Sequence, residues 1–231
     1  MKPAVPACAA ILGALIFSAA AAPKPKAVPA KPALPTATPA RAITQDQQTA
    51  QFLYDAALRE FAAGNLDAAK MRFQKVLSIA PENAPALINL ALIAQRQLRD
   101  EDAEKILRSV LQKDTRNATA WLLLGIRAYE QDKLDAALAH LAQAVLHAPQ
   151  DARAHQYLGA TLGRRGWHGA GEEELRRALE LDPKSADAHY NLAAIYMERV
   201  PPSVELARRH YVRAVELGAV PDEKLAERIG K

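Results

Sequence analysis

Apolar residues recur at three- and four-residue spacing through residues 50–220, in paired stretches of about a dozen residues each. One such pair contains Leu87, Leu90, Ala91 and Ala94, followed by Ala103, Ile106, Leu107 and Val110. This spacing places the apolar side chains of each stretch on one face of a helix. The pattern therefore predicts pairs of amphipathic helices, each pair joined by a short turn.

The paired stretches repeat at a step of 34 residues. Pro81, Pro149 and Pro183 lie 68 and 34 residues apart, and Thr115 fills the missing position. Small residues form one column at the same step: Ala57, Ala91, Gly125, Gly159 and Ala193. A second small column holds Ala69, Ala103, Ala137, Gly171 and, after a two-residue insertion at Pro201-Pro202, Ala207. A bulky column holds Phe73, Leu107, Leu141, Leu175 and Tyr211.

These columns have a physical explanation. Small residues let two helix backbones approach closely, and the bulky residues fill the space beside them. Proline at the end of a unit stops the second helix, and helix-starting residues follow it. Because one helical hairpin cannot bury its own apolar face, the units must stack on one another as a solenoid.

The repeated residues resemble the tetratricopeptide repeat family. The match is carried by the run Trp121–Gly125 with Tyr129, Ala137, Leu141, Ala144 and Pro149, and again by Ala154 to Pro183. It covers units at about 50–83, 84–117, 118–151, 152–185 and 186–220, within an array over 46–220. The resemblance implies an all-α, right-handed solenoid of antiparallel helix pairs. Residues 221–231 predict a short capping helix, with Leu225 and Ile229 facing the array.

The N-terminal residues have a different composition. A lysine near the start, an uncharged apolar run over 7–22 and a small-residue end predict a signal peptide over residues 1–21. The alternative is an uncleaved membrane anchor. Residues 22–45 hold six prolines between positions 23 and 39, which predict an extended linker. We therefore expect an exported protein, periplasmic or secreted, with no integral membrane span once the signal is removed.

Charge and cysteine content narrow the function further. The formal net charge of +4 includes Lys2, Lys24, Lys26, Lys31 and Arg41, so residues 42–231 hold 25 basic and 26 acidic residues, a net of −1. A nearly neutral array argues against nucleic acid as a partner, whereas the basic linker can make weak contact with an anionic surface. The single cysteine, Cys8, excludes a disulfide framework and a cysteine-based metal cluster.

No pattern of catalytic or metal-binding residues is present. His155 and His189 share a packing column with Leu87 and Trp121, and no close pair of metal-ligand spacing occurs. The glycines around Trp167 lack a phosphate-loop continuation, so they mark a loosened turn with Trp167 as an exposed contact. Asn117 begins a formal glycosylation sequon at a unit junction. We expect no enzyme activity, no metal and no cofactor.

The family resemblance implies a concave groove lined by the first helix of each unit. The repeat register predicts that the groove residues are Tyr54, Asp55, Leu58, Asn89, Leu92, Gln95, Arg96, Leu123, Ile126, Gln156, Tyr157, Arg164, Tyr190, Asn191 and Met197. Apolar side chains beside amides and tyrosine hydroxyls suit an extended peptide or a partner helix. The expected function is an exported protein–protein interaction scaffold, and the alternative is a regulatory or positioning subunit of an envelope enzyme complex.

Overall fold

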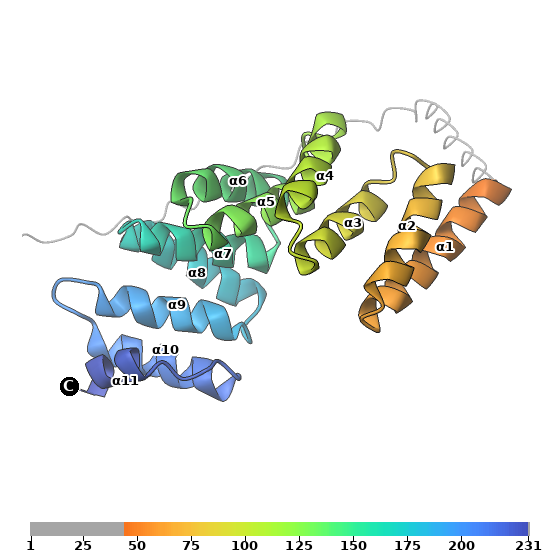
Figure 1. The fold of residues 1–231 in the computed structure, drawn as a ribbon. Coiled ribbons are helices and arrows are strands. Elements are labelled where there is room, and N and C mark those ends of the chain that lie inside the picture. Colours follow the sequence, from red (N-terminus) through yellow and green to blue (C-terminus); the bar gives the residue numbers. More distant parts are fainter. Residues whose placement is uncertain (1–43, 231) are drawn as a thin grey trace, which may run out of the picture. The chain divides into compact units, whose positions relative to one another are not determined.

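The computed structural model describes residues 44–230, and this part of the chain contains helices and turns but no strand (Figure 1). The predicted signal peptide and nearly all of the predicted linker fall outside the described residues. The helices are α1 (Gln45–Ala62), α2 (Leu66–Ile79), α3 (Ala84–Arg96), α4 (Asp100–Lys113), α5 (Ala118–Glu130), α6 (Leu134–His147), α7 (Ala152–Arg164), α8 (His168–Leu181), α9 (Ala186–Met197), α10 (Val204–Glu216) and α11 (Glu223–Gly230).

The helices pack as five consecutive pairs, from α1 with α2 to α9 with α10. Each pair also contacts the next, because the second helix of one pair packs on the first helix of the following pair. The prediction of an all-α solenoid of stacked helix pairs is confirmed. Among residues 44–230, no helix combines the length and apolarity that a membrane span requires.

Each first helix begins at a polar residue whose side chain accepts a backbone hydrogen bond. These N-cap residues are Thr44, Asn83, Asn117, Asp151 and Ser185. Such caps satisfy backbone N–H groups that have no partner within the helix. Asn117 accepts from the backbone N–H of Ala120 at 3.0 Å, so this residue of the sequon has a structural role.

The turns within the first four helix pairs share one geometry. In the first four pairs, a residue in the left-handed conformation follows the first helix, and the next N–H bonds to the carbonyl five residues back. This arrangement closes the helix C-terminus and normally uses glycine. The left-handed residues are Gly64, Leu98, Asp132 and Gly166, with φ values of 82°, 58°, 59° and 81°.

The small-residue columns lie where helices of a pair meet. A Cβ atom on Gly125 would stand 2.6 Å from Leu141 Cγ. In the next unit, a Cβ atom on Gly159 would stand 2.8 Å from the carbonyl oxygen of Gly171. Gly159 and Gly171 thus allow the backbones of α7 and α8 to contact each other directly, without a side chain between them. The bulky-column residues Phe73, Leu107, Leu141 and Leu175 are fully buried beside these contacts.

The C-terminal helix α11 covers the last pair, as predicted from its apolar residues. Leu225 and Ile229 are buried in a cluster with residues of α9. Asp222 holds the start of the helix: its Oδ1 accepts from the Leu225 N–H at 3.0 Å, and its Oδ2 accepts from the Tyr190 hydroxyl at 2.6 Å. Both Tyr190 and the cap are therefore part of one hydrogen-bonded junction.

Candidate functional site

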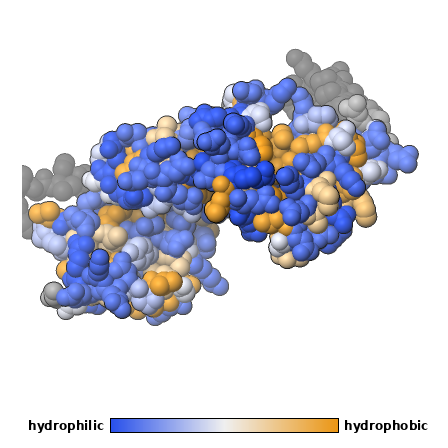
Figure 2. All heavy atoms as spheres, in the orientation of Figure 1, coloured by the Kyte–Doolittle hydropathy of each residue, from blue (hydrophilic) through white to orange (hydrophobic). Residues whose placement is uncertain are grey.

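Residues of the first helices line three surface hollows. The largest, of about 580 Å³, lies over α3, α5 and the start of α7. Leu92, Leu123 and Ile126 supply apolar atoms, and Gln95, Arg96, Leu98, Asp100, Arg127, Glu130, Gln131, Arg153 and Tyr157 complete the lining. On the face shown in Figure 2, hydrophobic residues gather over α1 to α4.

Two smaller hollows lie closer to the C-terminus of the array, mainly over α7 and α9. One, of about 220 Å³, is lined by Tyr129, Gln156, Tyr157, Ala160, Asp187, Tyr190 and Asn191. The other, of about 170 Å³, is lined by Ala160, Gly163, Arg164, His168, Asn191, Ala194, Ile195 and Glu198. Tyr157 borders both the first hollow and the second, and Asn191 borders both the second and the third. The three hollows are therefore adjacent along the array, and we call them together the groove.

An almost buried arginine lies at the wall of the largest hollow. Arg127 is 7% exposed, and its Nη1 forms an ion pair with Asp100 Oδ1 at 2.8 Å. Its Nε stands 3.7 Å from Glu104 Oε2 and has no hydrogen-bond partner. The hydrogen bond from Arg108 lowers the pKa of Glu104, and the neighbouring Arg127 charge acts in the same direction. The Glu104 carboxylate, which faces the Arg127 charge, is therefore ionised at neutral pH.

Tyrosines and amides dominate the second hollow. The rings of Tyr129 and Tyr157 pack edge to face with centroids 5.8 Å apart. Burial raises the pKa of the Tyr157 hydroxyl, and burial together with the hydrogen bond to Asp222 raises the pKa of Tyr190 to about 12. Both hydroxyls are therefore neutral at physiological pH and can take part in hydrogen bonds as donors. Gln156 accepts a hydrogen bond from Ser185 at 2.9 Å, which orients its amide.

The structure brings together most of the residues that the repeat register predicted. Those that line the groove are Leu92, Gln95, Arg96, Leu123, Ile126, Gln156, Tyr157, Arg164, Tyr190 and Asn191. The remaining ones, Tyr54, Asp55, Leu58, Asn89 and Met197, border none of the three hollows.

Two of these residues interact with each other and one is in the core. Asn89 Nδ2 donates to the Tyr54 hydroxyl at 3.1 Å, which links the first two units. Met197 is 6% exposed and belongs to the cluster that α11 covers, together with Leu225 and Ile229. The structure thus places Met197 outside the groove, because the capping helix encloses the end of α9.

Several groove residues were not predicted from the sequence. Leu98, Arg127, Tyr129, Glu130 and Arg153 all border a hollow. Leu98 stood out in one respect: its repeat column contains Gly64 and Gly166, so a leucine there is unusual. Nothing in the repeat pattern singled out Arg127 or Arg153, because the direction in which each side chain points depends on the neighbouring units.

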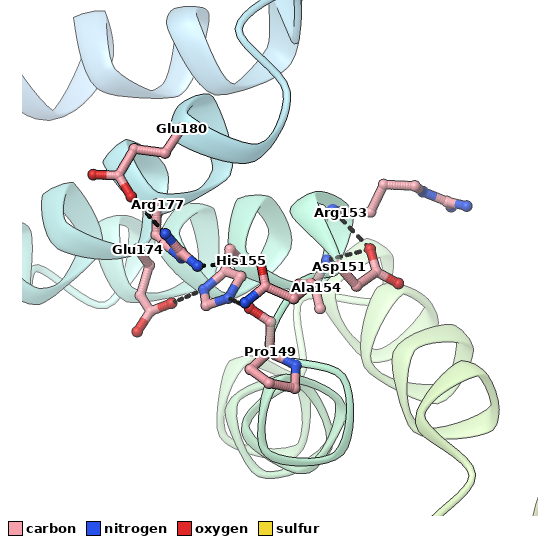
Figure 3. Close-up of polar contacts among 9 residues, drawn as sticks. Pro149, Asp151, Arg153, Ala154, His155, Glu174, Arg177 and Glu180 are labelled. Atoms are coloured by element: carbon pink, nitrogen blue, oxygen red, sulfur yellow. Dashed lines mark hydrogen bonds and ion pairs between the residues drawn. The ribbon is translucent and has the colours of Figure 1, made fainter.

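The histidine of the fourth unit has a structural environment. Figure 3 shows the His155 ring between Glu174 and the carbonyl of Pro149, with Nδ1 2.6 Å from Glu174 Oε2 and Nε2 3.1 Å from the Pro149 oxygen. Among residues 44–230, no group of three or more histidine, cysteine, aspartate or glutamate side chains could hold a metal ion. Trp167, the predicted exposed contact, is 54% exposed at the start of α8.

Models of repeat families match the chain in three places. The model described as tetratricopeptide repeat matches residues 60–109 and 101–160, and the model described as TPR repeat matches residues 173–199. The matched segments lie within the stacked helix pairs, from the end of α1 to the end of α9.

Two curated proteins are similar in sequence. The type IV pilus assembly protein PilF of Pseudomonas aeruginosa is 28% identical over 153 residues, which cover 64% of this chain and 59% of PilF. The protein O-mannosyl-transferase TMTC1 of Homo sapiens is 25% identical over 169 residues, which cover 71% of this chain and only 19% of TMTC1. The similarity therefore reaches less than two thirds of the length of either relative.

Solved structures share the fold. A structure of Pseudomonas aeruginosa PilF matches with a TM-score of 0.72 at 22% identity, over 81% of this chain and 85% of that one. YrrB, described as a TPR protein with an unusual peptide-binding site, matches with a TM-score of 0.58 at 20% identity, over 82% of this chain and 99% of that one. The repeat models, the sequence relatives and the stacked helix pairs together show that this chain belongs to the tetratricopeptide repeat family.

Proposed function

We propose that this protein is a non-enzymatic interaction scaffold that binds an extended peptide or a partner helix in the groove. Tetratricopeptide repeat proteins mediate protein–protein interactions, and the structural neighbour YrrB is described as having a peptide-binding site. The observation that carries the proposal is the row of three adjacent hollows along α3, α5, α7 and α9, in which each hollow shares a lining residue with the next.

The chemistry of the groove supports a peptide as the ligand. An apolar floor at one end can receive an aliphatic or aromatic side chain. Amides and hydroxyls further along, at Gln156, Tyr157 and Asn191, can hydrogen-bond to an extended backbone. This combination of apolar anchors and oriented polar groups is typical of surfaces that recognise peptides.

We further propose that the scaffold is exported and works in the periplasm or outside the cell. The apolar run over 7–22 supports removal of a signal peptide over residues 1–21, and the prolines of residues 22–45 support an extended spacer. The similarity to PilF, a pilus assembly protein, is compatible with a role in assembling an envelope structure.

The match to TMTC1 favours a second candidate function. In that case the array would position a separate catalytic protein in an envelope complex. The match covers 19% of TMTC1, so the transferase activity itself is not carried over to this chain.

Substitution of two groove residues tests the binding function. Leu92→Glu and Tyr157→Ala change half-buried residues of the groove, so the fold should persist while peptide binding is lost. The control is Leu146→Glu, which changes an exposed residue of α6. Crosslinking capture from the exported fraction, followed by mass spectrometry, gives the partners. A set of captured proteins that is the same for the wild type and both groove variants would exclude the groove as the binding site.

A further inference from the structure

Leu98 occupies a backbone conformation that does not suit leucine. It follows α3 with a φ of 58°, in the left-handed position that Gly64, Asp132 and Gly166 occupy in the neighbouring units. A Cβ atom in this conformation crowds the following carbonyl, so glycine, asparagine and aspartate are the residues that adopt it readily. A leucine at this position is therefore unfavourable for the local backbone.

Burial does not compensate for this conformation. The Leu98 side chain is 89% exposed, so nearly all of its apolar surface faces water. Neither the turn nor the core therefore gains from a large aliphatic side chain here. Residues in unfavourable backbone conformations cluster at functional sites, including those that hold a ligand.

The position of Leu98 indicates which ligand this is. Leu98 borders the largest hollow, whose floor includes Leu92, Leu123 and Ile126. Leu123 and Ile126 are buried and Leu92 is half-buried, so Leu98 is the most exposed aliphatic side chain of this lining. A large apolar side chain of a peptide could lie between Leu98 and Leu92 and exclude water from both.

The charges that line this hollow favour a peptide in which an acidic residue stands next to the large apolar residue. Asp100 and Arg127 form an ion pair with each other. Arg96 has no ion pair within residues 44–230, and its Cζ atom lies 4.3 Å from the centroid of the Phe61 ring. The Arg153 guanidinium also has no ion pair in the described part of the chain, and in Figure 3 it points away from Glu174 and Glu180. With Glu130 as the other unpaired charge, the lining carries a net charge of +1.

We propose that Leu98 is a ligand-binding residue and that the hollow selects a peptide segment with a large apolar side chain next to an aspartate or glutamate. The apolar side chain packs on Leu98 and Leu92, and Arg96 and Arg153 bind the carboxylate through charge-assisted hydrogen bonds. This inference rests on the proposed function and specifies the ligand of its groove.

A random peptide library displayed on phage and selected on the full chain identifies the preferred residues. The tightest peptide is then synthesised with a fluorescent label, and its Kd is measured by anisotropy for each variant. Leu98→Asn removes the apolar contact but suits the left-handed conformation, so the fold is retained. The matched control is Val220→Asn, because Val220 is 85% exposed in a loop and borders none of the three hollows.

We expect peptides that combine a large apolar residue with aspartate or glutamate. Leu98→Asn should raise the Kd about tenfold, and Val220→Asn should leave it unchanged. Arg96→Gln combined with Arg153→Gln should weaken binding and reduce its dependence on salt. Selected peptides without acidic residues, or a Kd that Leu98→Asn leaves unchanged, would overturn the inference.

The same measurement separates this inference from the function on which it rests. Peptides that bind the wild type but not Leu92→Glu, with no effect of Leu98→Asn, would retain groove binding and reject the role of Leu98. A library that yields no peptide bound more tightly by the wild type than by Leu92→Glu would reject both.

Discussion

Substitution of Gly159 by alanine gives a direct test of how the fourth helix pair is held together. A Cβ atom at this position would lie 2.7 Å from Leu175 Cγ, 2.8 Å from the Gly171 carbonyl oxygen and 3.0 Å from the Leu175 backbone nitrogen. Two of these three neighbours are backbone atoms, so rotation of a side chain cannot relieve the contact. The helices α7 and α8 must move apart to admit the methyl group.

Two opposing effects determine the expected size of the change. Alanine in place of glycine stabilises a helix interior by about 0.5–1 kcal/mol. Overpacking of a closely packed contact costs about 1–3 kcal/mol. Because the contact involves the backbone of both helices, we expect overpacking to prevail and the free energy of unfolding to fall by about 1–2 kcal/mol.

Urea unfolding followed by circular dichroism measures this difference. The matched control is Gly169→Ala in α8, where an added Cβ atom has no neighbour within 4 Å. The control should be as stable as the wild type or slightly more stable, since only the helix preference changes. If Gly159→Ala also matched or exceeded the wild type, close backbone approach could not explain the glycine in this column.

Three further predictions concern the turn, the histidines and the cap. Leu98→Gly should raise the free energy of unfolding by about 0.5–1 kcal/mol, because it relieves the left-handed leucine; an unchanged urea midpoint would contradict this reasoning. His189 and His210 have Nδ1 atoms 2.9 Å apart, and burial lowers the pKa of both. The unfolded chain therefore takes up protons first, so the melting temperature should fall as pH decreases below about 6.5, and His210→Asn should reduce this fall. Leu225→Ala should destabilise by about 2–3 kcal/mol and speed amide hydrogen exchange in α9, whereas unchanged exchange there would show that α11 does not protect the array.

The sequence predicted the positions of the groove residues only in part. A 34-residue step identifies which side chains share a column, so Leu92, Leu123 and Tyr157 could be assigned to one surface. The step cannot show how a terminal element alters that surface. Met197 shares the register of a groove residue, but α11 buries it, and no repeat precedent indicates that contact.

The charges of the groove were also beyond the reach of the repeat pattern. Arg127 and Arg153 both belong to first helices, but one is nearly buried against Asp100 and the other has no ion pair within residues 44–230. Which guanidinium is compensated depends on carboxylates from an adjacent helix. The periodicity of a helix predicts on which face of that helix a residue lies, but it does not predict which residues of the adjacent helix it contacts.

The sequence by itself determined the helix pairs, their stacking order and the cap. These follow from local physics: apolar spacing, N-cap residues, prolines at unit ends and small residues at close contacts act over a few turns of helix. Tertiary structure decided which side chains line the hollows, which charges remain unpaired and that Leu98 faces water in a left-handed turn. Those properties depend on how one unit lies against the next, and that arrangement exists only after the units have stacked.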